Sequence, residues 1–192
     1  MKPFWKKEPL SLAELELVEA VGKAHHESTF RSNPSTMAVC FAAQGSGDLL
    51  KAFVAGLSTI GGAHGPITET FDWLERSFSF AELAVKDFFA RNPDGKIPGW
   101  GSSFNKESVD PIWAPAASIL EGKFATTWRC IDETTKALHR RGKMVHPNPS
   151  AFTAATARVI GMPRALAPYL LVIGRLSSWA EVFLNETTRK EN

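Results

Sequence analysis

Apolar residues recur with helical spacing along nearly the whole chain, and no window alternates apolar and polar residues as a half-buried strand does. Within 48–57, for example, one stripe of a helix opened by Asp48 is apolar: Leu49, Leu50, Phe53, Val54 and Leu57. This pattern predicts an all-α fold. A hydrophobic content of 44% over 192 residues is enough for a buried core in one domain, or in a domain with a small lobe.

Start signals divide this pattern into separate helices. Ser11 with Glu14, and Ser79 with Glu82, form pairs typical of a capping box, in which both side chains satisfy free amides at a helix start. Asp110 is followed by a proline, which suits a capping residue and the first helical turn. We expect helices near 11–26, 35–44, 48–60, 67–78, 80–91, 111–121, 124–141, 152–160 and 164–185.

The charge balance gives no sign of a polyanionic partner. Lys and Arg number 22 against 20 Asp and Glu, a net charge of +2, so we expect neither nucleic acid nor an anionic membrane surface as a partner. Cys40 and Cys130 lie in apolar helical patterns without paired spacing, which predicts buried, reduced thiols. The longest apolar stretch, 166–173, is too short to span a bilayer, and residues 1–9 precede no apolar signal core. We expect a soluble, cytoplasmic protein.

Irregular segments at 27–34, 92–109 and 142–151, with a turn at 61–66, are the expected places for a site on a helical frame. The five histidines lack any metal-binding spacing, so we expect no metal site. His139 ends a predicted helix, where the helix dipole is reason enough for it. His64 stands between glycines at a helix junction, where a ligand-binding role and a plain turn are equally open.

The segment IPGWGSSFNK at 97–106 combines a proline and two glycines. Gly99 and Gly101 permit a close backbone approach that a side chain would block. The segment lacks the Lys-Ser/Thr ending of an ATP-binding loop and follows no predicted strand. It therefore predicts a shaped loop whose own side chains offer little chemistry.

Successive segments resemble, in order, the motifs of the citrate synthase family: NPSTMA (33–38), IGGAHGPITE (60–69), IPGWGSSFNKESVDP (97–111), NPSAFTAATARVIGMP (148–163) and IGRLSSWAEVFLNE (173–186). The resemblance covers only the carboxyl half of a typical citrate synthase, the part that citryl-CoA lyases also resemble. It implies a citrate synthase-like helical fold, with 1–66 and 148–192 in a large-domain-like part and 67–147 in a small lobe.

The resemblance also implies roles for individual residues. In that family one histidine bonds the thioester oxygen of acetyl-CoA, an aspartate removes the methyl proton, another histidine polarises the ketone of oxaloacetate, and arginines hold its carboxylates. His64 matches the first histidine and Arg175 a carboxylate-binding arginine. His26 matches the ketoacid-binding histidine, although extra residues at 28–32 follow it.

Other positions depart from the family pattern. Ser102 stands where a second histidine belongs, Ser150 where the base aspartate belongs, and Ile112 where an arginine belongs. A serine hydroxyl cannot remove an α-proton unless a neighbour activates it, and each lost acid–base step costs roughly 10² to 10⁴-fold in rate. Lys106 and His146 lie close in sequence, and either could take over part of a binding or proton-transfer role.

We therefore expect a protein that binds or acts on a CoA thioester and a carboxylate, with altered or lost carbon–carbon bond chemistry; ordinary citrate synthase activity is not expected. The alternative is a non-catalytic relative that serves as a binding or scaffold dimer. Helices 35–44 and 48–60 resemble the pair that builds the family's twofold interface, which predicts a homodimer, although they could instead form the monomer's core. A larger citrate synthase-like subunit is an alternative partner.

Overall fold

The computed structural model describes residues 5, 6, 8–28, 33–61, 65–101 and 108–189. The regular elements of these residues are helices, so the all-α prediction is confirmed. In chain order they are α1 (Leu12–Glu27), α2 (Pro34–Ser46), α3 (Leu49–Ser58), α4 (Ile67–Ser77), α5 (Ala81–Arg91), the 3₁₀ helix η1 (Pro111–Trp113), α6 (Ala114–Lys123), α7 (Ala125–Arg140), α8 (Pro149–Val159), the 3₁₀ helix η2 (Arg164–Leu166) and α9 (Tyr169–Thr188).

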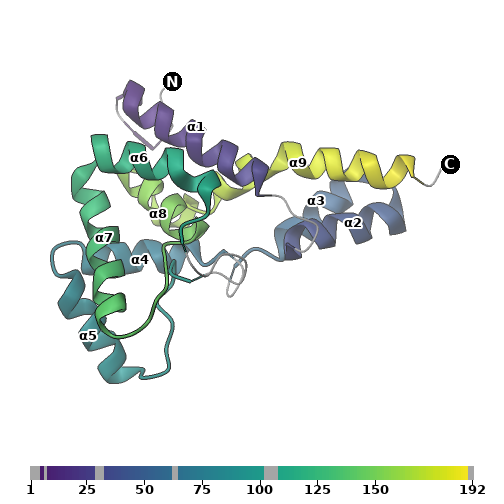
Figure 1. Cartoon of the computed structure of the whole chain (residues 1–192). Coiled ribbons are helices and arrows are strands. Elements are labelled where there is room, and N and C mark those ends of the chain that lie inside the picture. Colours follow the sequence, from purple (N-terminus) through teal and green to yellow (C-terminus); the bar gives the residue numbers. More distant parts are fainter. Residues whose placement is uncertain (1–4, 7, 29–32, 62–64, 102–107, 190–192) are drawn as a thin grey trace.

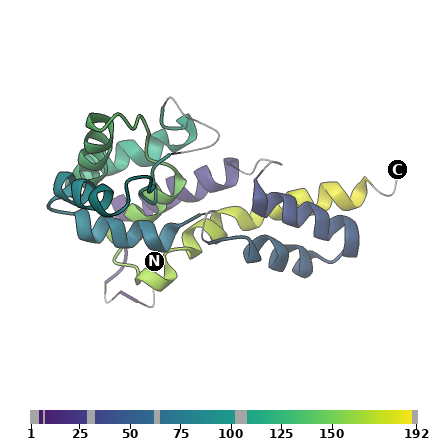
Figure 2. The ribbon, with the colours of Figure 1, turned by 90° about the horizontal axis from the view of Figure 1, so that it is seen from below.

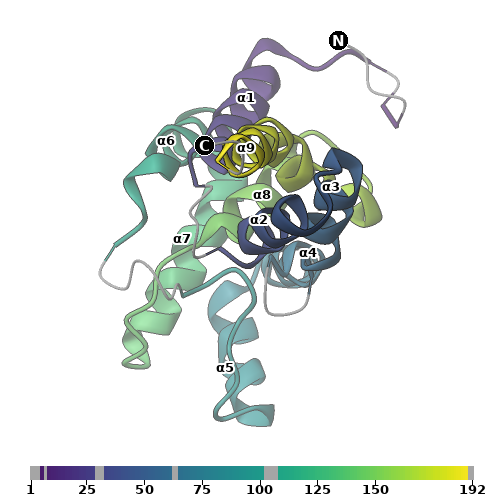
Figure 3. The ribbon, with the colours of Figure 1, turned by 90° about the vertical axis from the view of Figure 1, so that its right-hand side faces the viewer.

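The helices form a body and a projecting arm, which Figures 1 and 2 show from two sides. The body comprises α1 and α4 to α8. The arm comprises α2, α3 and the carboxyl-terminal half of α9. Helix α9 runs from the body into the arm, and in Figure 3, where it is viewed along its axis, α1, α2, α3 and α8 surround it.

Side-chain caps fix several helix starts. At α1, the Ser11 hydroxyl accepts from the Glu14 amide and the Glu14 carboxylate accepts from the Ser11 amide, which confirms the predicted capping box. Asp48 caps α3 as predicted. Asn33 and Asn148 cap α2 and α8, each followed by a proline in the first turn. These short polar residues set where the elements around the site begin.

Two predicted helix starts were wrong. The predicted Ser79–Glu82 capping box does not form, because the Phe80 amide donates to the Ser77 carbonyl in a turn and α5 begins only after Phe80. Helix α8 begins at Pro149, three residues before the predicted 152, because Asn148 caps it.

Two predicted helices also divide near proline. The expected helix 111–121 is a 3₁₀ turn followed by α6, with Asp110 accepting from the Ile112 amide as its predicted cap. The expected helix 164–185 is a 3₁₀ turn followed by α9, which starts just after Pro168. Because proline has no amide proton to donate to a helical hydrogen-bond ladder, the break between the 3₁₀ turn and α9 falls at Pro168.

One apolar cluster fills the body and draws on α1, α4, α6, α7 and α8. Trp113 stacks on Phe152, with ring centroids 5.5 Å apart, while Leu17 and Ile131 are also fully buried. Burying such side chains contributes roughly 1.5–3 kcal/mol each before entropy is counted. Because the cluster joins residues of 1–66 and 148–192 to residues of 67–147, these predicted parts share one core here; their behaviour as separate domains stays a prediction.

The arm has its own small cluster, made by Val39, Ala43, Ala52, Trp179 and Phe183. Close packing of α3 onto this cluster needs Gly56, because a Cβ there would lie 2.8 Å from Val39 Cγ2. The apolar stripe predicted on 48–57 lies mostly on the opposite face of α3, where its leucines and valine are exposed, with Leu50 at 72%. The arm therefore presents an uncovered apolar surface.

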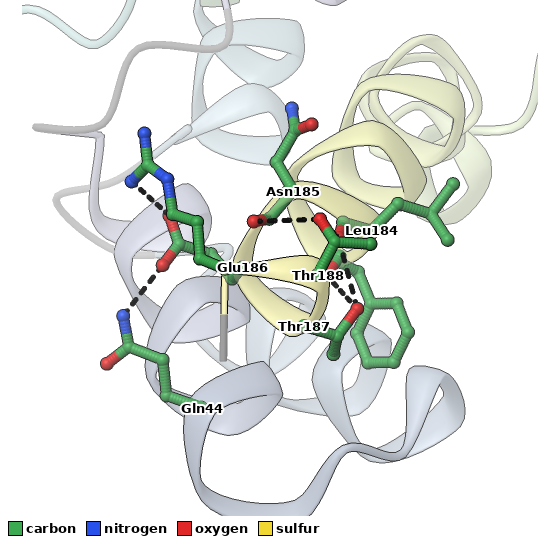
Figure 4. A network of polar contacts seen from close by, with 8 residues as sticks. Gln44, Leu184, Asn185, Glu186, Thr187 and Thr188 are labelled. Atoms are coloured by element: carbon green, nitrogen blue, oxygen red, sulfur yellow. Dashed lines mark hydrogen bonds and ion pairs between the residues drawn. The ribbon is translucent and has the colours of Figure 1, made fainter. Parts of the chain in front are cut away.

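A polar network ties the end of α9 to α2, as Figure 4 shows. Gln44 Nε2 donates to Glu186 Oε2 at 2.8 Å, and Arg189 approaches the other carboxylate oxygen at 3.5 Å. The Glu186 side chain is buried, so this pair of contacts holds the carboxyl-terminal end of the helix in the arm.

Both cysteines are free thiols. Cys130 is buried in α7, as predicted, and burial raises the pKa of its thiol; Cys40 is only half buried. None of the helices in the described part of the chain is both long and apolar enough to cross a membrane.

Candidate functional site

The site begins where α1 and α9 cross. A Cβ at Gly174 would lie 2.6 Å from the Cβ of His25 and 2.8 Å from the Gly22 carbonyl oxygen, so only glycine fits at 174. This close crossing sets the end of α1 against the next residue of α9, Arg175. The two helices thereby place an imidazole beside a guanidinium in the interior.

Arg175 is buried, with 4% of its surface exposed. Its Nη1 donates to the Ser35 hydroxyl at 2.9 Å and its Nη2 to the Ser28 hydroxyl at 3.5 Å. Its Nε has no acceptor among the described residues. Burial lowers the pKa of Arg175 to about 10, which still leaves it charged at neutral pH. The site thus holds a buried cation whose hydrogen-bond partners among the described residues are neutral hydroxyls.

His25 lies fully buried next to this guanidinium. Its Nε2 is 2.8 Å from the Thr153 hydroxyl, which donates its own proton to the Pro149 carbonyl at 2.7 Å. Because a hydroxyl has one proton, His25 Nε2 must be the donor in this pair. Burial, and then the charge of Arg175, lowers the pKa of His25 to about 3. The imidazole is therefore neutral at physiological pH, and it packs edge-on against Trp113 with ring centroids 4.9 Å apart.

His26, the predicted ketoacid-binding residue, is half exposed instead. Its Nδ1 lies 3.0 Å from the Ser177 hydroxyl and its Nε2 4.0 Å from the Glu181 carboxylate. The structure thus places His25, not His26, against Arg175. Helical spacing could have predicted that His25 is the buried histidine, since residue 25 follows buried Leu17 and Val21 at intervals of four.

The loop before residue 102 is joined to the start of α8 by Asn148. The Asn148 amide donates to the Gly99 carbonyl at 2.9 Å, and its Nδ2 donates to the Gly101 carbonyl at 2.8 Å. Its Oδ1 accepts from the Ser150 amide at 2.9 Å, and the Gly101 amide donates to the His146 carbonyl at 2.9 Å. One side chain therefore caps the helix and clamps the loop.

Backbone conformation and local packing explain why both positions of this loop are glycine. Gly99 has φ +89°, and a Cβ there would lie 2.5 Å from Thr70 Cγ2. Gly101 has φ +88° with more room, since a Cβ there would lie 3.6 Å from Val145 Cγ1. The close approach anticipated at Gly99 is thus made by the protein itself, onto α4. Contacts of these glycines with a ligand stay a prediction.

Ser150 lies buried in the first turn of α8. It precedes Thr153 by three residues, so both side chains share one helix face, the face that meets His25. His146 contacts His139 with ring centroids 5.2 Å apart, and His139 lies in the last turn of α7 as predicted. The predicted residues His64, Ser102 and Lys106 lie outside the described residues.

No three His, Cys, Asp or Glu side chains of the described ranges come together as a metal site would require. The chemistry that these ranges offer is instead a buried cation, hydroxyl groups and a neutral imidazole. Such a set suits recognition of an anion that also carries hydrogen-bonding oxygens.

The sequence profile of the citrate synthase C-terminal domain matches residues 4–190. The chain belongs to this family. A search of curated proteins finds no match. The family predicted from the motifs is thereby confirmed.

Solved structures show the same fold. The citryl-CoA lyase from Hydrogenobacter thermophilus superposes with a TM-score of 0.84 at 22% identity, covering 96% of this chain and 73% of that one. Citrate synthase from Thermotoga maritima MSB8 gives 0.75 at 20% identity, covering 90% and 49%. Methanosaeta concilii ATP citrate lyase, solved as a D541A mutant with (3S)-citryl-CoA, gives 0.80 at 13% identity, covering 97% and 33%. The chain thus spans about half of that citrate synthase and a third of that ATP citrate lyase.

Proposed function

We propose that this chain binds a CoA thioester together with a small carboxylate, and that its carbon–carbon bond chemistry is altered or lost relative to citrate synthase and citryl-CoA lyase. The buried Arg175 carries this proposal. A buried charge costs several kcal/mol unless it is paired, and the described residues offer this guanidinium only hydroxyl partners in hydrogen-bond reach. A ligand carboxylate would supply the missing charge through paired hydrogen bonds.

The CoA part of the proposal rests on family membership. The related ATP citrate lyase was solved with (3S)-citryl-CoA, a thioester of this class. In this chain His64 is proposed to meet the thioester oxygen, with Lys106, Gly99 and Gly101 contributing to binding.

The change in chemistry rests on the residues at the start of α8. Ser150 stands where the resemblance places the aspartate base, and a serine hydroxyl is a poor base without an activating partner. His25 does not supply that partner through Nε2, because this nitrogen donates to Thr153. With Ser102 also lacking an imidazole, we propose binding with slow, altered or absent turnover.

The second candidate is a binding or scaffold dimer without catalysis, and the uncovered apolar face of the arm favours it. Phe41 on α2 and Val54 on α3 are both more than half exposed. We propose that a second copy covers this face through α2 and α3, in a homodimer. Dimerisation is compatible with either function, and a larger citrate synthase-like subunit is an alternative cover.

Calorimetric titration of the full chain with CoA, acetyl-CoA and citrate tests the proposal. We expect heat with a CoA ligand and with a carboxylate. Arg175→Met should abolish carboxylate binding while CoA binding persists, whereas Arg91→Met on exposed α5 should change neither. Circular dichroism of each variant checks the fold. Absence of heat with every CoA ligand would contradict the proposal and leave the scaffold function.

Restoring the family's acid–base groups tests the altered chemistry. Ser102→His combined with Ser150→Asp should produce citrate or citryl-CoA turnover, since a carboxylate in the first turn of α8 is also favoured by the helix dipole. If the folded double variant gains no turnover, the assignment of these two positions is wrong.

A further inference from the structure

A groove lies between α4 and α5, at the end of the body away from the arm (Figure 1). It encloses about 260 Å³, and its apolar lining consists of Trp73, Phe80, Leu83, Ala84 and Phe88. Positions 80, 84 and 88 follow one another at intervals of four, so they lie along one side of α5. The groove therefore follows the axis of this helix.

The lining of the groove combines exposed apolar side chains with a packed aromatic floor. Phe80 is 69% exposed and Leu83 is 55% exposed, although both are large and apolar. The rings of Trp73 and Phe88 pack edge to face, with centroids 5.8 Å apart. Such a surface favours the burial of further apolar side chains that a partner would bring.

Two arginines border the groove without carboxylate partners. Arg76 Nε donates to the Asp72 carbonyl at 3.3 Å, and Arg91 Nε donates to the Asp87 carbonyl at 3.2 Å. The Asp72 carboxylate is already bound by Arg164. Neither Arg76 nor Arg91 forms an ion pair with a carboxylate in the described ranges. With Asp87 as the acid of the lining, two positive charges stand against one negative charge.

A second groove, on the side of α5 that faces α7, has no such excess of positive charge. Two cations and two acids border it: Lys86, Arg140, Glu82 and Glu133. Moreover, Arg140 Nη1 lies 2.7 Å from Glu82 Oε2, so these two charges already neutralise each other. The groove between α4 and α5 is therefore the one whose charge favours an acidic partner.

The elements that form the groove favour a helix as its occupant. The groove offers side chains of α4 and α5, whose backbone groups are bonded within those helices, so an extended strand would find no backbone to pair with. Helix α5 has 11 residues and is thus about 16 Å long, which matches about three turns of a bound helix. Each turn can place one apolar side chain in the groove.

We propose that the groove between α4 and α5 docks an acidic amphipathic helix of another protein. Its apolar stripe lies against the lining between Trp73 and Leu83, and carboxylates beside the stripe pair with Arg76 and Arg91. This interaction surface does not include the site at Arg175, and the inference does not depend on the proposed function.

Synthetic peptides test this inference. Each has about 15 residues, a terminal fluorescein and leucines at positions i, i+4, i+7 and i+11 of a helix. In one peptide glutamates flank the leucines, and in its matched control lysines occupy the same positions. Fluorescence anisotropy measures the binding of both to the full chain. We expect the glutamate peptide to bind about tenfold more tightly, and the difference to shrink as salt is added.

Variants of the chain locate the binding. Leu83→Glu should weaken binding of the glutamate peptide by about tenfold, because it brings a like charge into the apolar lining. Arg76→Glu combined with Arg91→Glu should make the lysine peptide the tighter ligand. Leu50→Glu, the same substitution at another exposed leucine, is the control and should change neither affinity. All four side chains are exposed, so the variants should fold, which circular dichroism checks.

Several outcomes would overturn the inference. These are equal binding of the two peptides, binding of neither, and equal weakening by Leu83→Glu and Leu50→Glu. A change in the oligomeric state of Leu83→Glu, measured by light scattering after gel filtration, would also overturn it, because a second copy of this chain would then cover the groove. A preference for the glutamate peptide that is lost in Leu83→Glu and retained in Leu50→Glu supports it.

Discussion

The body and the arm use the same kinds of residues in opposite ways. In the body, large apolar side chains such as Trp113 and Phe152 face one shared cluster. In the arm, small residues such as Ala52 and Gly56 face inward, while Leu50 and Val54 face outward. The body thus buries its large apolar side chains within the chain, whereas the arm leaves an apolar face uncovered, as interaction surfaces do.

The site lies at the root of the arm, where α9 leaves the body. Arg175 donates to Ser28, at the carboxyl end of α1, and to Ser35, in the first turn of α2. Helix α2 therefore connects the guanidinium to the face that we propose a second copy covers. We therefore expect substitutions in the body to change chiefly the free energy of unfolding, and substitutions in the arm to change chiefly the oligomeric state.

The largest expected effect is on the aromatic cores. Trp113→Ala should lower the free energy of unfolding by about 3–5 kcal/mol at every protein concentration, because it empties the body's cluster. If the proposed homodimer forms, Trp179→Ala, in the arm's cluster, should cost more as the protein is diluted, because dissociation would uncover the arm. Urea unfolding at two protein concentrations measures both. If Trp179→Ala lowers the free energy of unfolding equally at both protein concentrations, the stability of the arm, like that of the body, does not depend on a second molecule.

Glycine substitutions compare the packing of the two regions. Gly174→Ala should destabilise by about 1–3 kcal/mol, because its Cβ would meet the backbone of α1. Gly56→Ala in the arm meets Val39 and should also destabilise. The control is Gly45→Ala, whose Cβ would have no neighbour within 4 Å and which should stabilise by about 0.5–1 kcal/mol. Thermal unfolding ranks the three, and a stabilising Gly174→Ala would refute the close crossing.

Acid should weaken the body through His25. The unfolded imidazole binds a proton near its ordinary pKa of 6.5, whereas in the folded protein the pKa is about 3. Stability is therefore lost as pH falls below 6.5, by about 2 kcal/mol at pH 5. Asp72, whose pKa is lowered by its hydrogen bond with Arg164, loses its contribution only below its ordinary value of 3.8.

Chemical denaturation at pH 7 and pH 5 measures this loss. His25→Gln should remove most of it, while His26→Gln, a substitution at the adjacent position of α1, should retain it. A wild-type stability that is equal at both pH values would show that His25 is not held neutral in the fold.

The smallest effect on unfolding is expected at the outer face of the arm. Leu50→Glu should change the unfolding free energy of the monomer by no more than about 0.5 kcal/mol, because the side chain is largely exposed. It should nevertheless convert a dimer into a monomer, as measured by light scattering after gel filtration. Leu83→Glu on α5 is the control and should keep the dimer. A dimer that survives Leu50→Glu would move the interface away from α3.

Helix positions and family membership could be read from the sequence, because both depend on local patterns. The Ser11 capping box and the Asp48 cap are examples in which two or three neighbouring residues decide the outcome. The capping box predicted at Ser79 was wrong because the Phe80 amide donates to the Ser77 carbonyl in a turn, so that the helix begins one residue later than expected. The residues of the capping pattern alone do not reveal this turn.

The geometry of the site could not be predicted in the same way, because it depends on contacts between residues that lie far apart in the sequence. The apolar stripe on 48–57 showed which residues share a face, but not that this face lies outside the monomer. The burial of His25 could have been predicted from helical phase, because it continues the series of Leu17 and Val21 at intervals of four. The charge environment of Arg175 could not, because Ser28, Ser35 and His25 reach it through the tertiary fold.

The double role of Asn148 has a mechanical consequence. Its side-chain oxygen holds the start of α8 while its amide nitrogen holds the Gly101 carbonyl, immediately before position 102. A ligand that displaces Gly101 would therefore also act on the start of α8, the helix that bears Ser150. Gly101 and the start of α8, far apart in sequence, are thus joined through one side-chain amide group.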